Sequence, residues 1–394
     1  MLLAQLTLNS AAKTYVRHEL KARAFSRRLL AWYERNQRNL PWRATHDPYR
    51  VWLSEIMLQQ TRVAAVIEHY HEFLRRFPNV KKLAAAREAS VLAAWSGLGY
   101  YRRARMMHAA AKVIVRERGG KFPASEKKLR DLPGIGRYTA AAIASMAFGE
   151  AVAVVDGNVE RVLQRVSGKR LAGEELWEAA NHLLDGDRPG DFNQAMMELG
   201  ATVCTPRAPA CLTCPVIGLC ATRGELAAIS KPAPQKKREI HYALHYRNLD
   251  YRNGDGRTGE VFLVQRARDA SLMPGMWELP EVVGGNGGGA PSLSLRHSIT
   301  TTDYTVKVWR LPSPVGVRGE WIPVERLSRM ALTGLARKIL RQVGRLCKTN
   351  LPPRHRGTEE GRPGPGGVLS AVSSASSKMK AGRAMVYALA TKHS

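Results

Sequence analysis

Four cysteines lie close enough together in the sequence to hold one metal group. Cys204, Cys211, Cys214 and Cys220 are separated by six, two and five residues, so one compact loop can gather all four sulfurs. Thiolates arranged in this way bind a [4Fe–4S] cluster or a tetrahedral zinc ion. Disulfides are less favoured, because nothing upstream is typical of a secreted protein and Cys-x-x-Cys spacing favours metal or redox chemistry. The spacing alone leaves cluster and zinc open.

Two carboxylates have sequence surroundings that favour opposite protonation states. Glu55 has Val51, Trp52 and Leu58 as helical neighbours, and an apolar environment would raise its pKa and keep a proton available near neutral pH. Asp156 follows an apolar run and begins a helical pattern, and a helix N-terminus favours the anionic form of a carboxylate. Each has an ordinary alternative, since Glu55 can be a surface ion-pair partner and Asp156 a simple helix N-cap.

The segment Leu132-Pro133-Gly134-Ile135-Gly136 is predicted to join two helices. Glycines at positions 134 and 136 allow a tight turn and leave bare N–H groups at a helix N-terminus, where they can bind a DNA phosphate. An ordinary helix–helix turn is the alternative. The following Tyr138-Thr139-Ala140 makes the motif more specific than two glycines alone.

These motifs belong to a longer series. In chain order the series is Leu40-Pro41-Trp42-Arg43, Pro48 to Glu55, Gly97-Leu98-Gly99-Tyr100-Tyr101, the hairpin, Asp156-Gly157-Asn158-Val159 and the four cysteines. Across about residues 38–220 it resembles the MutY-type adenine DNA glycosylases, and this context favours a [4Fe–4S] cluster over zinc. Residues 272–280 and 333–337 are similar to the Nudix-like domain of that family.

The resemblance implies a base-excision repair enzyme that removes adenine mispaired with 8-oxoguanine or guanine in double-stranded DNA. Glu55 would be the general acid and Asp156 would stabilise an oxocarbenium-like sugar, with Tyr138 hydrogen-bonded at the reacting centre. The adenine would be flipped out of the duplex, and Tyr100 would act as a wedge beside its partner base. The residues expected to line the adenine pocket are Leu40, Trp42, Arg43, Gln60 and Gln194.

Two alternative functions can be distinguished from an adenine glycosylase by particular residues. Endonuclease III-type enzymes, which act on damaged pyrimidines as glycosylase and lyase, carry a Schiff-base lysine where this chain has Tyr138, so a monofunctional enzyme is predicted. Arg137 cannot substitute, because a guanidinium stays protonated. A non-catalytic Fe–S DNA-binding protein is the other alternative, and the presence of both Glu55 and Asp156 argues against it. A Nudix hydrolase activity is not expected, because residues 239–346 lack a Glu-rich box for Mg²⁺.

One segment departs from the family pattern. Family members carry Phe-Ser-His in a C-terminal loop that reads 8-oxoguanine, and alignment on Arg296-His297-Ser298 places Ile299-Thr300-Thr301 there. The imidazole is therefore missing. We expect the protein to discriminate between 8-oxoguanine and guanine less strongly than is usual for the family.

The elements that must position these residues are helical in the first part of the chain and mixed in the second. We expect an all-α helix-hairpin-helix glycosylase core with a [4Fe–4S] loop, followed by an α+β Nudix-like domain. Strands are expected at residues 239–247, 260–266 and 304–311, and a helix at residues 332–343. The predicted parts are an N-terminal extension 1–22, a glycosylase domain 23–228 with the cysteine loop 204–220, a linker 229–238, the Nudix-like domain 239–346 and a disordered tail 347–394.

The charge balance favours a polyanionic partner. The chain has 61 Lys and Arg against 33 Asp and Glu, a formal net charge of +28, which fits double-stranded DNA as the partner. A membrane surface is less favoured, and no stretch approaches the about 18 apolar residues of a membrane span. Because the N-terminus has no secretory pattern, we expect an intracellular protein of the cytoplasm, of the bacterial type that associates with the nucleoid. We also expect a monomer.

Overall fold

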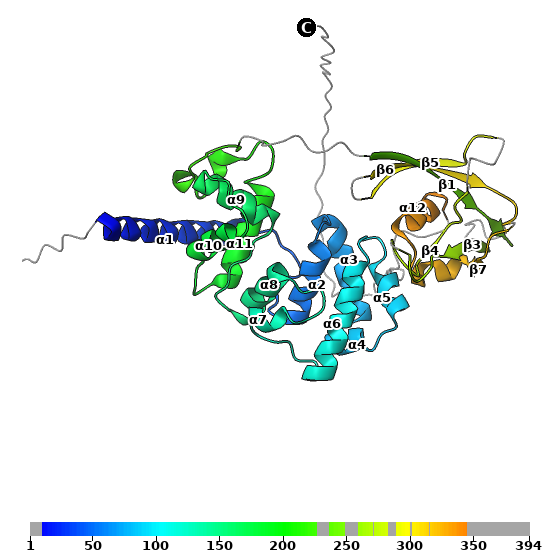
Figure 1. Cartoon of the computed structure of the whole chain (residues 1–394), viewed down its shortest axis with the longest axis horizontal. Helices are drawn as coiled ribbons and strands as arrows, with labels where there is room; N and C mark the ends of the chain where they lie inside the picture. Colours follow the sequence, from blue (N-terminus) through cyan, green and yellow to red (C-terminus); the bar gives the residue numbers. More distant parts are fainter. Residues whose placement is uncertain are drawn as a thin grey trace, which may run out of the picture. The chain divides into compact units, whose positions relative to one another are not determined.

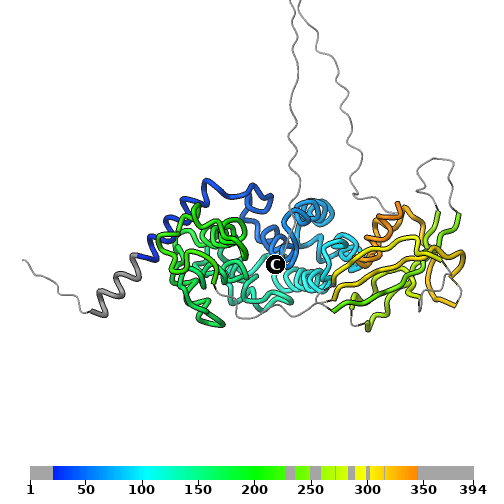
Figure 2. The backbone as a smooth tube through the Cα atoms, turned by 90° about the horizontal axis from the view of Figure 1, so that it is seen from above, coloured from blue at the N-terminus to red at the C-terminus, as the bar shows by residue number. Residues whose placement is uncertain are grey.

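Helices form the first part of the chain, and strands dominate the second (Figure 1). The computed structural model describes residues 10–226, 236–248, 259–270, 272–282, 289–299, 302–314 and 316–344, with side chains from residue 21 onward. The tube in Figure 2 runs from the blue-to-green helical part into the green, yellow and orange strands and helix of the α+β part. None of the described helices is long and apolar enough to cross a membrane.

The helical part is a series of α-helices joined by short turns. They are α1 (Ser10–Asn36), α2 (Pro48–Leu58), α3 (Val63–Arg76), α4 (Val80–Ala84), α5 (Glu88–Trp95), α6 (Arg102–Arg118), α7 (Glu126–Leu129), α8 (Arg137–Phe148), α9 (Gly157–Ser167), α10 (Glu174–Leu183) and α11 (Pro189–Thr202). Two short 3-10 turns follow, Cys211–Thr213 and Ile217–Leu219. The predicted turn at residues 132–136 lies between α7 and α8, so it joins two helices as expected.

Helix α2 carries Glu55 into the interior. It begins at Pro48, whose missing N–H costs nothing at a first helical position, and the Asp47 carboxylate caps it by accepting a 2.8 Å bond from the Tyr49 amide. Trp52, Leu53 and Met57 are completely buried. Burying each such side chain contributes about 1.5–3 kcal/mol, and α2 packs these residues against α8. The backbone beside Glu55 is therefore firmly held.

A second hydrophobic core forms where α1, α9, α10 and α11 meet, separate from the core around α2 and α8. Gly200 on α11 allows its helix to approach α9 closely. A Cβ atom added there would lie 2.6 Å from the Asn158 Cβ and 2.9 Å from its carbonyl oxygen. This close approach fixes the first turn of α9, and Asp156 is the N-cap of that turn.

The α+β part contains two small sheets and one helix. In the first sheet, β6 (Thr302–Arg310) lies between β1 (Lys236–Leu244), which is parallel to it, and β5 (Leu293–Ile299), which is antiparallel. In the second, β3 (Glu260–Gln265) pairs with β2 (Tyr246–Arg247), β4 (Trp277–Glu278) and β7 (Glu320–Pro323). A 3-10 segment (Val324–Arg329) leads to α12 (Gly334–Gln342), whose apolar side chains share a core with the strands.

Buried polar contacts join the α+β part to the end of α5. The Leu332 carbonyl accepts hydrogen bonds from the Ser96 hydroxyl at 2.8 Å and the Tyr101 hydroxyl at 2.9 Å. Arg337 Nε donates to the Ser96 hydroxyl oxygen at 2.6 Å. Met276 and Ala331 also belong to the core that surrounds α2. The segment that carries Tyr100 is thus in contact with the α+β part at both ends, through Ser96 and Tyr101.

Two boundaries differ from the sequence-based expectation. Helix α1 begins at Ser10, within the predicted N-terminal extension 1–22, because residues 10–22 include three Ala and two Lys, which favour helix. Strand β1 begins at Lys236 rather than at residue 239, since three basic residues that also suit a solvated linker pair with β6 as an exposed strand end. The predicted linker before residue 236, the tail 347–394, Thr300, Thr301 and the Ile299 side chain lie outside the described residues.

Candidate active site

The predicted catalytic and adenine-pocket residues meet around one cavity of about 540 Å³. Helix α2 contributes Glu55, α8 contributes Tyr138, the start of α9 contributes Asp156, and α11 contributes Gln194. The rest of the predicted set comes from the segments flanking α2, namely Leu40, Trp42, Arg43 and Gln60. The structure therefore brings together residues that are far apart in the chain.

Glu55 is an internal carboxyl group at the wall of this cavity. Its residue surface is only 4% exposed. Burial raises the pKa of Glu55 to about 7, the nearby charge of Asp156 acts in the same direction, and the hydrogen bond from Tyr138 opposes the shift. The direction agrees with the expectation from its apolar neighbours. At neutral pH a substantial fraction of molecules carry a proton on Glu55, as a general acid requires.

The Tyr138 hydroxyl is hydrogen-bonded to Glu55 Oε2. It also lies 3.7 Å from the Met197 sulfur. Burial, together with the charges of Glu55 and Asp156, raises the pKa of Tyr138 well above its usual value. Tyr138 therefore stays a neutral hydroxyl, which orients one oxygen of Glu55 and leaves the other available to a ligand.

The Asp156 carboxylate caps helix α9 and also faces the cavity. Its Oδ1 accepts hydrogen bonds from the amides of Asn158 at 2.9 Å and Val159 at 2.8 Å, and its Oδ2 accepts one at 2.9 Å from the Asn158 side chain. The N-cap interpretation and the catalytic one are thus compatible. Hydrogen bonds from the first turn of the helix thus fix the orientation of this carboxylate at the cavity.

A second buried carboxylate in the cavity was not predicted from the sequence. Glu198 is 1% exposed and forms a salt bridge to Arg43 at 2.8 Å and another to Arg38 at 2.7 Å. Burial alone would raise the pKa of Glu198, but hydrogen bonds from both arginines lower it to about 2. Glu198 lies four residues after Gln194, so both lie on one face of α11. The four-residue spacing from Gln194 is the feature of the sequence that could have indicated Glu198 as a cavity residue.

The apolar wall of the cavity is also part of the hydrophobic core. Leu40 and Trp42 are 6% and 7% exposed, and the Trp42 ring packs against Tyr70 edge to face at 5.4 Å. Both side chains are thus core residues, and their remaining surface lines the cavity. Opposite them, the Gln194 Oε1 accepts a 3.2 Å bond from Tyr33, which fixes its amide.

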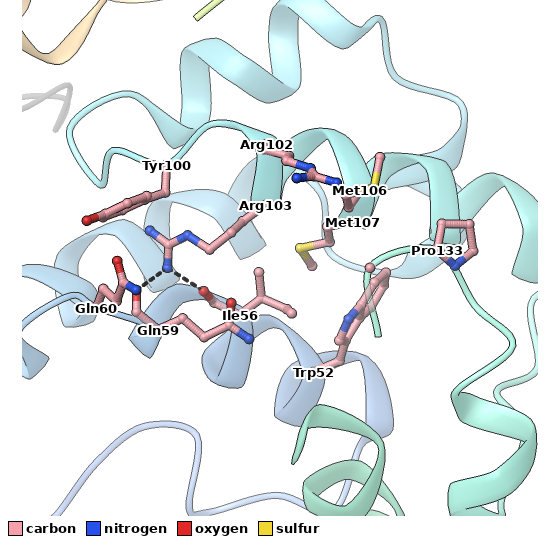
Figure 3. Close-up of a pocket in the computed structure, with 11 residues that line it drawn as sticks. Trp52, Ile56, Gln59, Gln60, Tyr100, Arg102, Arg103, Met106, Met107 and Pro133 are labelled. Carbon is pink, nitrogen blue, oxygen red and sulfur yellow. Dashed lines mark hydrogen bonds between the residues drawn. The ribbon is translucent and has the colours of Figure 1, made fainter. Parts of the chain in front are cut away.

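Tyr100 lines not this cavity but a neighbouring one of about 460 Å³ (Figure 3). Gly134 lines the same neighbouring cavity. Tyr100 is 46% exposed, as expected for a side chain that contacts a ligand outside the protein. Gly134 has φ +74°, and a Cβ atom there would lie 2.4 Å from the Met106 Cβ, so only glycine fits. Gly136 is the N-cap of α8 and has no side-chain constraint. Gln59 and Gln60 line both cavities.

Known proteins resemble most of the described chain. A family profile described as "HhH-GPD superfamily base excision DNA repair protein" matches residues 53–182. The human adenine DNA glycosylase is 46% identical over 236 residues, which cover 56% of this chain and 43% of the human protein. The chain thus spans less than half the length of this relative. A solved structure, a thermostable thymine-DNA glycosylase, has 32% identity and a TM-score of 0.49, covering 52% of this chain and 97% of that one.

A relative from fission yeast establishes the family to which the chain belongs. The adenine DNA glycosylase of Schizosaccharomyces pombe is 32% identical over 328 residues, which cover 67% of this chain and 70% of the yeast protein. The chain belongs to the adenine DNA glycosylase family. The resemblance noted from the order of the sequence motifs is therefore confirmed, and so is a helical glycosylase fold followed by a separate α+β region.

In this member of the adenine DNA glycosylase family the four cysteines line one small pocket, as their spacing predicted. Arg165 Nη1 donates to the Cys204 sulfur at 3.4 Å, and the Arg223 amide donates to the Cys220 sulfur at 3.4 Å. Among the described residues, no three or more His, Cys, Asp or Glu side chains are arranged as a metal site. The donor chemistry nevertheless suits a thiolate-bound group, because N–H donors directed at sulfur stabilise thiolates.

Proposed function

We propose that the protein is a monofunctional DNA glycosylase that removes adenine mispaired with 8-oxoguanine or guanine in double-stranded DNA. The observation that carries the proposal is the buried Glu55 carboxyl, whose pKa is raised to about 7, on the same cavity as Asp156. Two carboxyl groups with different protonation states are what acid-assisted glycosidic cleavage needs. Membership of the family supports adenine as the base that is released.

The reaction assigns a separate task to each carboxyl group. Protonated Glu55 donates its proton to a ring nitrogen of adenine, so the electron pair of the breaking C1′–N9 bond can leave with a neutral base. The sugar becomes oxocarbenium-like, and the Asp156 carboxylate stabilises its positive charge. Water then adds to C1′ and gives a proton to the Glu55 carboxylate, which restores the acid. Tyr138 keeps Glu55 oriented through both steps.

The cavity suits one base removed from the duplex. A volume of about 540 Å³ lies within the range of about 300–1,000 Å³ that is usual for ligand pockets. Leu40 and Trp42 would contact the face of the adenine, while the amides of Gln60 and Gln194 would hydrogen-bond its edge. The buried Glu198 would hold Arg43 at the cavity wall through their 2.8 Å salt bridge.

Strand cleavage is not part of the proposed activity. A lyase needs an amine that attacks C1′ and forms a Schiff base, and Tyr138 occupies the position where endonuclease III-type enzymes carry that lysine. The Tyr138 hydroxyl is instead hydrogen-bonded to Glu55. The expected product is an intact strand with an abasic site.

Residues outside the main cavity would bind the rest of the duplex. Tyr100 would fill the base stack beside the partner base, and the N–H groups of the Gly134 and Gly136 turn would bind a phosphate. The α+β part would act as a Nudix-like domain that encloses the DNA. Because Thr301 replaces the usual histidine of its loop, we expect modest discrimination between 8-oxoguanine and guanine.

A [4Fe–4S] cluster is the group that best suits Cys204, Cys211, Cys214 and Cys220. The cluster would supply four iron–thiolate bonds that cross-link the loop after α11. Arg165 bonds the Cys204 sulfur and also the carbonyls of Thr205 at 2.7 Å and Pro206 at 3.1 Å. This side chain would therefore hold the loop in the shape that the cluster requires.

The proposed function is tested by the bases that the protein releases. Duplexes that pair adenine with 8-oxoguanine, guanine, cytosine or thymine should lose adenine at different rates, fastest opposite the two purines. The strand should break only after alkali or heat, and borohydride should trap little covalent complex. Release of damaged pyrimidines with efficient trapping would instead identify an endonuclease III-like enzyme, and no release from any duplex would indicate a non-catalytic protein.

A further inference from the structure

The Arg103 guanidinium joins the end of α2 to the turn that carries Tyr100. Its Nη1 donates to the carbonyl oxygens of Ile56 at 2.7 Å, Met57 at 3.3 Å and Gln59. Its Nη2 donates to the Thr61 hydroxyl at 3.3 Å and to the carbonyl oxygens of Leu98 at 3.2 Å and Gly99 at 3.3 Å. Figure 3 shows the guanidinium between Tyr100 on one side and Ile56, Gln59 and Gln60 on the other.

The chemistry of these acceptors explains why an arginine is present. The last carbonyls of a helix lack partners within the helix and favour a cation, and those of Ile56 and Met57 lie in the last turn of α2. Burial lowers the pKa of Arg103 to about 10, so it remains charged at neutral pH. Its planar fork can reach two segments at once, whereas a lysine presents a single ammonium on a flexible chain.

Both segments held by Arg103 contain a residue in the left-handed backbone region. Gln60 has φ +53° and Tyr100 has φ +48°, a conformation that is uncommon for residues other than glycine and is kept only when the surroundings enforce it. Gln59 and Thr61 flank Gln60, and Gly99 precedes Tyr100, so Arg103 bonds a neighbour of each. The guanidinium carbon also lies 5.4 Å from the centre of the Tyr100 ring.

Of these two residues, Gln60 lies at the boundary between the cavities. Gln60 lines both the larger cavity, which contains Glu55, and the smaller one, which contains Tyr100. Glu55 immediately precedes Ile56, whose carbonyl Arg103 binds. A shift of the Tyr100 turn would therefore move the Arg103 side chain and, through it, the end of α2 that carries Glu55.

We propose that Arg103 is a positioning residue that fixes the Gln60 and Tyr100 turns relative to α2, and thereby makes adenine release depend on the base opposite the adenine. The inference rests on the proposed function, in which adenine occupies the larger cavity and Tyr100 contacts its partner. Arg103 acts through the two turns and the helix end.

The test replaces Arg103 while preserving or removing its charge. Arg103→Lys keeps the charge and loses the fork, and Arg103→Met loses both. Arg116→Lys is the matched control, because Arg116 is on the same helix but is 71% exposed and paired with Glu117. Thermal unfolding and visible absorbance establish that each variant is folded.

Single-turnover rates of adenine release are measured with adenine opposite 8-oxoguanine, guanine and cytosine. A 2-aminopurine beside the partner base reports insertion of Tyr100 by its fluorescence. Arg103→Lys should still release adenine, but the ratio of its rates opposite 8-oxoguanine and cytosine should fall at least tenfold, and the fluorescence should lose its dependence on the partner base. Arg116→Lys should match the wild type in both.

The inference would be overturned if a folded Arg103→Lys kept the wild-type ratio of release rates opposite 8-oxoguanine and cytosine. It would also be overturned if this ratio were near one in the wild type. If neither Arg103 variant folds, Thr61→Val decides, since it removes the 3.3 Å bond without changing charge or size. It should lower the ratio by a smaller factor, and an unchanged ratio overturns the inference. If the wild type releases no adenine from any duplex, the proposed function itself fails.

Discussion

The Tyr138 hydroxyl and the Glu55 carboxyl are hydrogen-bonded in the interior, although 83 positions separate them in the chain. Helices α8 and α2 pack against each other and bring them together. Tyr138 stabilises the ionised form of Glu55, while burial and Asp156 destabilise it. The balance places the pKa of Glu55 near neutrality, where one group can both donate and accept a proton during a reaction cycle.

The raised pKa of Glu55 predicts that stability falls as pH rises from about 4.5 to about 7. Its pKa is about 4.5 when unfolded and about 7 when folded, so the folded state binds the proton more tightly. Between these values the free energy of unfolding should fall as pH rises, by about 2–3 kcal/mol in total. Glu55→Gln cannot ionise and should lack this loss. Chemical denaturation of both proteins at pH 5 and pH 8 checks it, and an equal pH dependence would contradict the assigned pKa.

Glu198 predicts the opposite pH dependence. Its pKa is lowered to about 2 by Arg38 and Arg43, so its contribution is present above about pH 4.5 and is lost as pH falls. Glu198→Gln should reduce the free energy of unfolding at pH 7 by about 3 kcal/mol, because the largely covered Arg43 guanidinium would lose its anion. Glu174→Gln is the control, since that ion pair with Arg137 is exposed and should cost less than about 1 kcal/mol. Equal losses in the two variants would be inconsistent with a buried network.

The two hairpin glycines should respond differently to alanine. At Gly134 the φ of +74° and the 2.4 Å approach to Met106 exclude a Cβ atom, whereas Gly136 has nothing within 4 Å. Gly134→Ala should distort the turn and weaken duplex binding at least tenfold, and Gly136→Ala should cause a much smaller loss. Fluorescence anisotropy with a labelled duplex measures both. If the two variants bind equally, the turn geometry does not govern DNA binding.

Much of the site follows from residue types and order. The apolar helical neighbours of Glu55 already indicate a raised pKa, and Glu55 is found on one cavity with Asp156, which lies at a helix start as predicted. Distances in the sequence cannot show that Arg38 and Arg43 meet Glu198, about 155–160 positions later, because that contact depends on how α11 packs. The same holds for Arg103, because most of its partners are backbone carbonyl oxygens, which leave no side-chain pattern in the sequence.

The cysteine loop predicts iron in the purified protein. Four thiols on one pocket should bind a [4Fe–4S] cluster, giving a yellow-brown protein with about four irons per chain. Cys214→Ser should lower the iron content and the thermal midpoint, while Cys347→Ser should leave the iron content unchanged. Metal analysis of anaerobically prepared protein is the measurement. Stoichiometric zinc without iron would contradict the cluster.

The role of Glu55 as the acid is tested most directly by the single-turnover rate of adenine release from a duplex with adenine opposite 8-oxoguanine, measured for the wild type and Glu55→Gln from pH 5 to pH 9. We predict that the wild-type rate falls as pH rises through about 7, the pKa of Glu55, because the neutral acid is lost. We also predict that Glu55→Gln binds the duplex but releases adenine at least a hundredfold more slowly, since general acid catalysis typically contributes about 10²–10⁴ in rate. A Glu55→Gln rate close to that of the wild type would contradict the assignment of Glu55 as the acid.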